Sequence, residues 1–190
     1  MSGLTILIIR HAEKPEESWP GPGLTVNGVP DDKSLVIRGW QRAGSWSALF
    51  GTGLGGPDYP RPDLIYAADP NGTVSHETSQ RPFETVTPLA ARLGPNPPDT
   101  SCAVGEEVKL VDAVLGQTGV ILIAWEHKAI ARTILPLIAK DQSIPGMPTK
   151  WDGTRFDVVL RFDRASPDSP WTFRQLFPCL LSGDSDTPMP

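Results

Sequence analysis

An arginine and a histidine stand side by side after the first apolar run of this chain of 190 residues. The run covers residues 4–9, and Arg10 and His11 follow it directly. In an open α/β sheet, ligands bind at the carboxyl ends of the strands, so this pair would face a ligand. A guanidinium binds phosphate oxygens through charge-assisted hydrogen bonds, and an imidazole can attack phosphorus. The pair therefore predicts a site that holds or transfers a phosphoryl group.

Two more residues of the same kinds follow later strands. Arg81 lies at the start of an expected helix, where a cation opposes the helix dipole. An anion held by Arg81 together with free backbone N–H groups would explain that position. His127 follows a buried apolar run. Two plainer interpretations stay open: an ion pair of Arg81 with Glu77 or Glu84, and a partly buried His127 at a helix cap.

The strands that would position these residues can be read from the apolar pattern. Continuous runs rich in Ile, Leu and Val, typical of central parallel strands, occupy 4–9, 63–68 and 119–124. Toward the end of the chain the apolar period changes to two, over 156–163 and 171–177. This alternation predicts two antiparallel strands that complete one sheet.

Helices are expected between these strands. Apolar residues recur at helical spacing over 38–50, 80–93, 105–115 and the segment after His127. Strands that alternate with helices predict an α/β fold, namely a three-layer α/β/α sandwich. Its sheet is mostly parallel, with antiparallel edge strands near the C-terminus. The chain length suits a single domain over 1–190, and the polar, Pro-containing stretch 182–190 predicts a flexible tail.

Four short motifs carry a resemblance to a known family. They are Arg10-His11-Ala12, Gly39-Trp40-Gln41-Arg42-Ala43, Ser79-x-Arg81-x-x-x-Thr85 and a late His127 after a buried strand. In type and order they resemble the motifs of the histidine phosphatase superfamily, which includes the cofactor-dependent phosphoglycerate mutases and many small phosphatases. Two departures stand out. Ala12 replaces the usual Gly, and Glu126-His127-Lys128 replaces the usual Ser-His-Gly.

The resemblance implies a mechanism without a metal or another cofactor. His11 would be the nucleophile and form a phosphohistidine, while Arg10, Arg81 and a protonated His127 would stabilise the equatorial oxygens. In the family a Glu often serves as the general acid. Glu107 is the preferred candidate. Its rivals are Glu106, Glu126 and Glu13, and Glu106 and Glu107 could instead simply be first-turn acids of a helix.

The predicted function is a metal-independent phosphatase that hydrolyses a phosphomonoester or a protein phosphohistidine. Two alternatives remain. The first is a phosphotransferase of the phosphoglycerate mutase type, although the short span between Arg81 and His127 leaves little room for a cap that excludes water. The second is a non-catalytic phosphate-binding domain with a degenerate site. The expected partner is a small phosphorylated substrate or a phosphoprotein, and the sequence indicates no oligomeric state.

Composition narrows the remaining classes. A net charge of −5 argues against a nucleic-acid partner, and no apolar stretch approaches the length of a membrane span. The start of the chain lacks the basic region of a signal peptide, so we expect a cytoplasmic protein. Cys102 and Cys179 are then expected to be reduced and structural.

Overall fold

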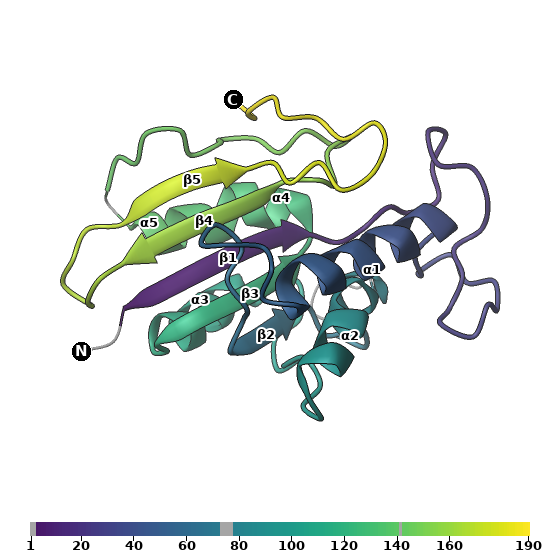
Figure 1. The fold of residues 1–190 in the computed structure, drawn as a ribbon, viewed down its shortest axis with the longest axis horizontal. Helices are drawn as coiled ribbons and strands as arrows, with labels where there is room; N and C mark the ends of the chain where they lie inside the picture. Colours follow the sequence, from purple (N-terminus) through teal and green to yellow (C-terminus); the bar gives the residue numbers. More distant parts are fainter. Residues whose placement is uncertain (1–2, 73–77, 141) are drawn as a thin grey trace.

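The computed structural model describes residues 3–72, 78–140 and 142–190. Five strands form one sheet in the order β2-β3-β1-β4-β5 (Figure 1). Their bounds are β1 Leu4–Arg10, β2 Leu64–Ala67, β3 Gly119–Trp125, β4 Val159–Arg164 and β5 Thr172–Leu176. β1, β2 and β3 are parallel, and β4 and β5 add antiparallel pairs at one edge. The predicted mostly parallel sheet is confirmed.

Helices cover both faces of this sheet (Figure 1). They are α1 Ile37–Gly51, α2 Arg81–Leu93, α3 Glu107–Leu115, α4 His127–Ala129 and α5 Leu135–Ala139, with a π-helical turn Ile130–Ile134 between α4 and α5. α1 and α2 pack with one core cluster on one face, and α3 to α5 pack with another on the opposite face. The three-layer sandwich that the sequence predicts is therefore the observed fold. None of the helices among the described residues has the length and apolar character to cross a membrane.

The register of the central strands positions the residues of interest. Arg10 is paired with Trp125 at the carboxyl ends of β1 and β3, and the His11 N–H donates to the Trp125 carbonyl at 3.0 Å. His127 follows two residues after Trp125. Because β1 and β3 run parallel, His11 and His127 both leave the sheet at the same edge.

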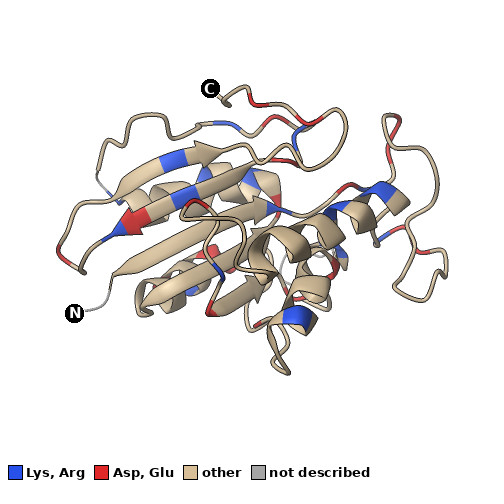
Figure 2. Ribbon diagram, in the orientation of Figure 1, with Lys and Arg blue, Asp and Glu red and all other residues tan. Residues whose placement is uncertain are grey.

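Charged residues in the sheet gather on the antiparallel strands β4 and β5 (Figure 2). The central strands β1 and β3 are almost entirely apolar, as expected for strands covered on both faces. β4 begins at Val159, three residues later than predicted. The reason is that Phe156 does not pair with β1: its ring packs beneath the guanidinium of Arg10 at 3.7 Å.

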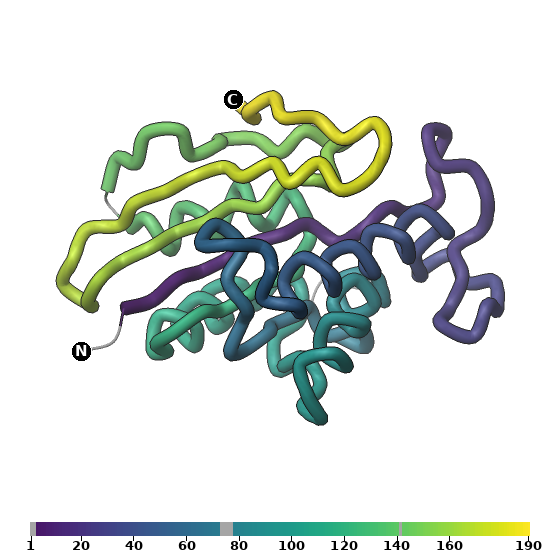
Figure 3. Tube along the Cα trace, viewed as in Figure 1, coloured from purple at the N-terminus to yellow at the C-terminus, as the bar shows by residue number. Residues whose placement is uncertain are grey.

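The C-terminal segment 182–190, for which the sequence predicts a flexible tail, makes defined contacts with the rest of the fold. It runs beside the segment that precedes β4 (Figure 3). Met189 is buried, its N–H donates to Gln175 Oε1 at 2.9 Å, and its carbonyl accepts Gln175 Nε2 at 2.8 Å. Asp184 is paired with Arg42 on α1. The polar composition of this segment does not reveal these contacts, because their partners lie far away in the sequence.

Candidate active site

His11 is held in one tautomer at the carboxyl end of β1. Its side chain is buried, with the residue only 6% exposed, and its Nδ1 lies 2.8 Å from the Ala12 carbonyl. A carbonyl oxygen only accepts, so Nδ1 carries the hydrogen and Nε2 keeps its lone pair. Burial and the neighbouring Arg10 cation lower the pKa of His11 to about 3. The imidazole is therefore neutral at physiological pH, as a nucleophile must be.

Thr85 joins two of the sequence motifs. The Ala12 N–H donates to Thr85 Oγ1 at 2.8 Å, and the Thr85 hydroxyl donates to the Arg81 carbonyl at 2.7 Å. Thr85 is fully buried. The motif includes this residue, but the sequence alone does not predict what it does. The structure shows that it ties the loop after β1 to the first turn of α2.

Arg10 is nearly inaccessible and braced by backbone carbonyls. Its Nη1 donates to the Gly153 carbonyl at 2.6 Å and to the Arg155 carbonyl at 3.1 Å. Burial lowers the pKa of Arg10 to about 10, so it stays a cation at neutral pH. Within the described part of the chain, its Nε is buried without a hydrogen-bond partner. A buried, unpaired donor is costly, and an anion would satisfy it.

Arg81 is braced in a similar way at the start of α2. Its Nε donates to the Ser34 carbonyl at 3.3 Å, and its Nη2 donates to the Asp32 carbonyl. Burial lowers its pKa. Glu84, one expected partner, instead accepts hydrogen bonds from the Ser34 hydroxyl and the Leu35 N–H. The other, Glu77, lies outside the described residues.

Two hollows are lined by these side chains. One has a volume of about 250 Å³ and is lined by His11, Lys33, Thr78, Ser79, Arg81, Pro82, Val104, Glu126 and Lys128. The other has a volume of about 460 Å³, and its lining includes Arg10, Lys14, His127 and Lys128. Lys128 lines both. The structure thus brings Arg10, His11, Arg81 and His127 to adjoining hollows at the carboxyl edge of the sheet.

Glu126 fixes the neighbourhood of His127. His127 Nδ1 lies 2.8 Å from Glu126 Oε1, and Glu126 Oε2 accepts the Ala129 N–H at 2.8 Å, which caps α4. Burial alone would raise the pKa of Glu126, but the contact with His127 and the N–H groups of Lys128 and Ala129 outweigh it and lower the pKa to about 2. Glu126 is therefore ionised at neutral pH.

The other three carboxylates named as candidate acids lie elsewhere. Glu107 is buried, and its Oε1 accepts the Trp125 indole N–H and the Gly105 N–H, both at 2.9 Å. Glu106 accepts the Ala103 N–H ahead of α3. Glu13 is buried in an ion pair with Arg42 at 2.7 Å. Of the four, Glu126 is the one that lines the hollow reaching His11.

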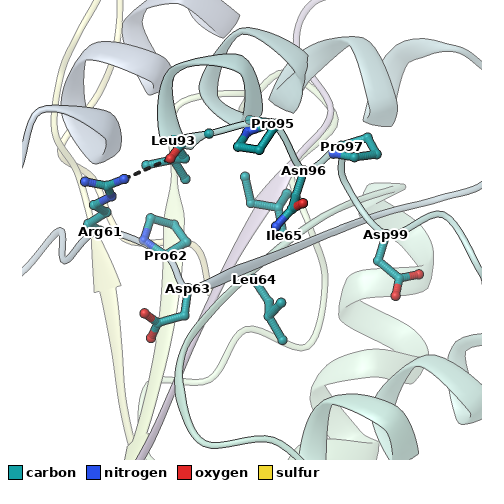
Figure 4. Close-up of a pocket in the computed structure, with 12 residues that line it drawn as sticks. Arg61, Pro62, Asp63, Leu64, Ile65, Leu93, Pro95, Asn96, Pro97 and Asp99 are labelled. Carbon is teal, nitrogen blue, oxygen red and sulfur yellow. Dashed lines mark hydrogen bonds between the residues drawn. The ribbon is translucent and has the colours of Figure 1, made fainter.

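A separate cavity lies beside β2, away from these residues (Figure 4). Its volume is about 370 Å³. Arg61, Asp63 and Asp99 line it together with several prolines and the start of β2. Arg61 donates to the Leu93 carbonyl at 3.0 Å, as the dashed line in Figure 4 marks. Over the residues described, no cluster of three or more His, Cys, Asp or Glu side chains could hold a metal ion.

The sequence and the fold were compared with those of known proteins. The sequence matches no protein-family model and no curated protein. Among solved structures, the fold is similar to that of the mycobacterial glucosyl-3-phosphoglycerate phosphatase, with a TM-score of 0.51 and 11% identical residues. The match covers 92% of this chain and 98% of that one. A likeness at this identity concerns the fold.

Proposed function

We propose that this protein is a phosphatase that hydrolyses a phosphomonoester, or a phosphohistidine in a protein, through a phosphohistidine on His11 and without a metal. The observation that carries the proposal is the state of His11. Its Nδ1 donates to a backbone carbonyl, and burial beside a cation keeps the ring neutral. This leaves Nε2 as an unprotonated nucleophile at the edge of a cationic hollow.

Phosphate binding would fall to the braced cations. Arg10 offers a buried Nε with no partner among the described residues. Arg81, at the start of α2, is held by the carbonyls of Ser34 and Asp32. Together with His127 these arginines would stabilise charge on the three equatorial oxygens. Both arginines are oriented before a ligand arrives, so little reorganisation accompanies binding.

The reaction would proceed in two displacements. In the first, Nε2 of His11 forms a bond to phosphorus while the bond to the leaving oxygen breaks, and that oxygen takes a proton from a general acid. In the second, water attacks phosphorus, the N–P bond breaks, and the proton of water passes to the conjugate base. Glu107 remains our proposed acid. Because Glu107 accepts the Trp125 indole N–H, it would have to reach the leaving oxygen from that position. The ionised Glu126, which lines the hollow at His11, would orient the attacking water.

The similar solved structure supports a general phosphatase activity. Its name states that it acts on glucosyl-3-phosphoglycerate, and the substrate of this chain is a separate question. The hollow at His11, of about 250 Å³ with Lys33 and Lys128 at its walls, favours a small anionic phosphomonoester over a bulky one.

The test is hydrolysis of an aryl phosphate in the presence of a chelator, comparing wild type with His11→Ala. We expect hydrolysis that the variant loses, and an alkaline quench of the wild type should trap one phosphoryl group on His11. Hydrolysis that survives in His11→Ala would overturn the proposal. Phosphate that stabilises both proteins without any turnover would point instead to a binding domain.

A further inference from the structure

A line of buried charges connects the C-terminal segment with the loop that carries His11. Arg42 is 2% exposed and lies between Glu13 and Asp184, whose side chains are 0% and 3% exposed. Arg42 Nη2 is 2.7 Å from an oxygen of each carboxylate, and its Nε and Nη1 complete two bidentate pairs. Glu13 is two residues after His11.

The charges in this cluster balance. Arg38 Nε lies 3.4 Å from Glu13 Oε1, and its Nη2 lies 3.7 Å from Asp184 Oδ1. Two cations thus face two carboxylates. Removal of one member leaves a buried charge without its partner, which is strongly unfavourable. The position of Glu13, and of the backbone before it, therefore depends on Asp184 near the end of the chain.

The C-terminal segment also binds Arg155, whose backbone carbonyl accepts a hydrogen bond from Arg10. Arg155 Nη1 donates to the Thr187 carbonyl at 2.7 Å, and its Nη2 donates to the Ser185 carbonyl at 2.8 Å. Asp157 links the same two residues, because it accepts hydrogen bonds from Arg155 Nε and from the Ser185 N–H, each at 2.7 Å. The carbonyl of Arg155 is one of the two that receive Arg10 Nη1.

We propose that the C-terminal segment 182–190 positions the catalytic pair through two arms. Asp184 acts on His11 through Arg42 and Glu13, and the carbonyls of Ser185 and Thr187 act on Arg10 through Arg155. The inference rests on the proposed function, since the pair it positions is the nucleophile and the phosphate ligand of that reaction. Asp184 and Arg155 are positioning residues that touch no substrate.

The two arms predict separable kinetic effects. The first arm ends at the loop of His11, so its loss should misalign the attack on phosphorus and lower kcat. The second arm ends at Arg10, so its loss should weaken phosphate binding. A small displacement of a reacting group can reduce the rate by about a hundredfold, which sets the scale for the first arm.

The test of the first arm compares Asp184→Asn with Asp186→Asn, an exposed carboxylate of the same segment. For Asp184→Asn we expect kcat for an aryl phosphate to fall at least about tenfold, with inhibition by inorganic phosphate changed less than about twofold. Asp184→Glu should recover part of the rate, because it restores the carboxylate. Asp186→Asn should behave as wild type. Assays run well below each variant's Tm exclude simple unfolding.

The test of the second arm compares Arg155→Lys with Arg174→Lys, an exposed arginine on β5. Lysine cannot reach both carbonyls as a guanidinium does. Arg155→Lys should weaken inorganic phosphate binding about tenfold and raise KM in parallel, while Arg174→Lys changes neither. This milder change also keeps the proposal testable if Asp184→Asn fails to fold.

Outcomes against the proposal are specific. An unchanged kcat in folded Asp184→Asn, or an equal loss in Asp186→Asn, would overturn the first arm. Unchanged phosphate affinity in Arg155→Lys would overturn the second. If wild type itself does not hydrolyse phosphate esters, the proposed function fails. The two arms are then judged by phosphate affinity and by hydrogen exchange of the Ala12 N–H, which should quicken in both arm variants.

Discussion

The hollow at His11 and the cavity beside β2 differ in charge far more than in size. The first, about 250 Å³, has Lys33, Arg81 and Lys128 in its walls against the single carboxylate Glu126. The second is larger, about 370 Å³, and has one arginine against two aspartates (Figure 4). Volume would favour the second cavity over the hollow at His11, although the adjoining hollow at Arg10 and His127, about 460 Å³, is larger than both. A phosphoryl group carries negative charge, and of the two cavities compared only the first offers an excess of cations.

Their places in the sheet differ as well. The first opens at the carboxyl ends of β1 and β3, and the second lies against the amino-terminal start of β2 at the edge of the sheet. In the first, the Arg81 guanidinium is oriented by the carbonyls of Ser34 and Asp32, so binding needs little reordering. Arg10, in the adjoining hollow, is oriented in the same way by the carbonyls of Gly153 and Arg155. In the second, Arg61 is exposed and makes its bond across the rim. The proposed function therefore rests on the oriented cations and not on cavity volume.

The largest effect should come from removing the nucleophile. We expect His11→Ala to lower kcat/KM for an aryl phosphate by at least about a thousandfold, since the imidazole proposed to form the bond to phosphorus is removed. Arg61→Ala, in the cavity beside β2, should stay within about twofold of wild type. A comparable loss in Arg61→Ala would show that the two cavities act together and would break the contrast.

The second effect concerns the geometry of Arg81. Lysine keeps the charge but cannot donate to Ser34 and Asp32 while also facing a phosphate. Arg81→Lys should reduce kcat/KM about ten- to a hundredfold. The matched change Arg61→Lys should have no effect. Equal activity of Arg81→Lys and wild type would mean that charge alone suffices and that the bracing is incidental.

The third effect is a pH dependence of stability that comes from His11. Its folded pKa, about 3, lies below the ordinary value of 6.5, so the unfolded chain binds the extra proton as pH falls between these values. Wild type should therefore lose stability on acidification. The part of this loss that comes from His11, of the order of 2 kcal/mol in the free energy of unfolding at pH 5, should be absent in His11→Gln. Urea unfolding at pH 7 and pH 5 measures it. Parallel losses in the two proteins would contradict a buried, neutral His11.

The sequence predicted what local patterns determine. Apolar runs located β1 and β3, and the parallel arrangement of these strands is what brings His11 and His127 to one edge. Bonds between distant segments could not be predicted in this way. The carbonyls of Gly153 and Arg155 that orient Arg10 come from about 145 residues further along the chain, and no periodicity marks them.

The carboxylates show the same limit. The distance of Glu107 from Arg81 along the sequence favours it as the acid, yet Glu107 is buried against Trp125 and does not line the hollow at His11. Its role as the acid stays a prediction, which a loss of kcat in Glu107→Gln would support. For the ion pair of Glu13 with Arg42 the sequence offers part of a signal, because Arg42 belongs to a quoted motif and Glu13 directly follows another. What the sequence could not show was that Asp184 completes the pair, since a polar tail looks free.

The smallest expected effect concerns the stability contributed by Glu126, the single carboxylate that lines the hollow at His11. The folded pKa of Glu126, about 2, lies below the ordinary 4.5, so its stabilising share is present above pH 4.5 and lost as pH falls toward 2. Glu126→Gln keeps an oxygen for the Ala129 N–H but loses the charge beside His127. We expect it to be about 1 kcal/mol less stable at pH 7, allowing for partial exposure.

That difference should shrink as unfolding is measured from pH 5 down to pH 3. Glu106→Gln provides the comparison, because Glu106 also accepts a backbone N–H ahead of a helix but has the exposed Lys109 at 3.6 Å in place of a histidine. A difference that stays constant over this range would mean that Glu126 acts as a cap and not as a charge. The ionised carboxylate would then lose its place as the counterpart of His127, and water orientation in the second displacement would need another group.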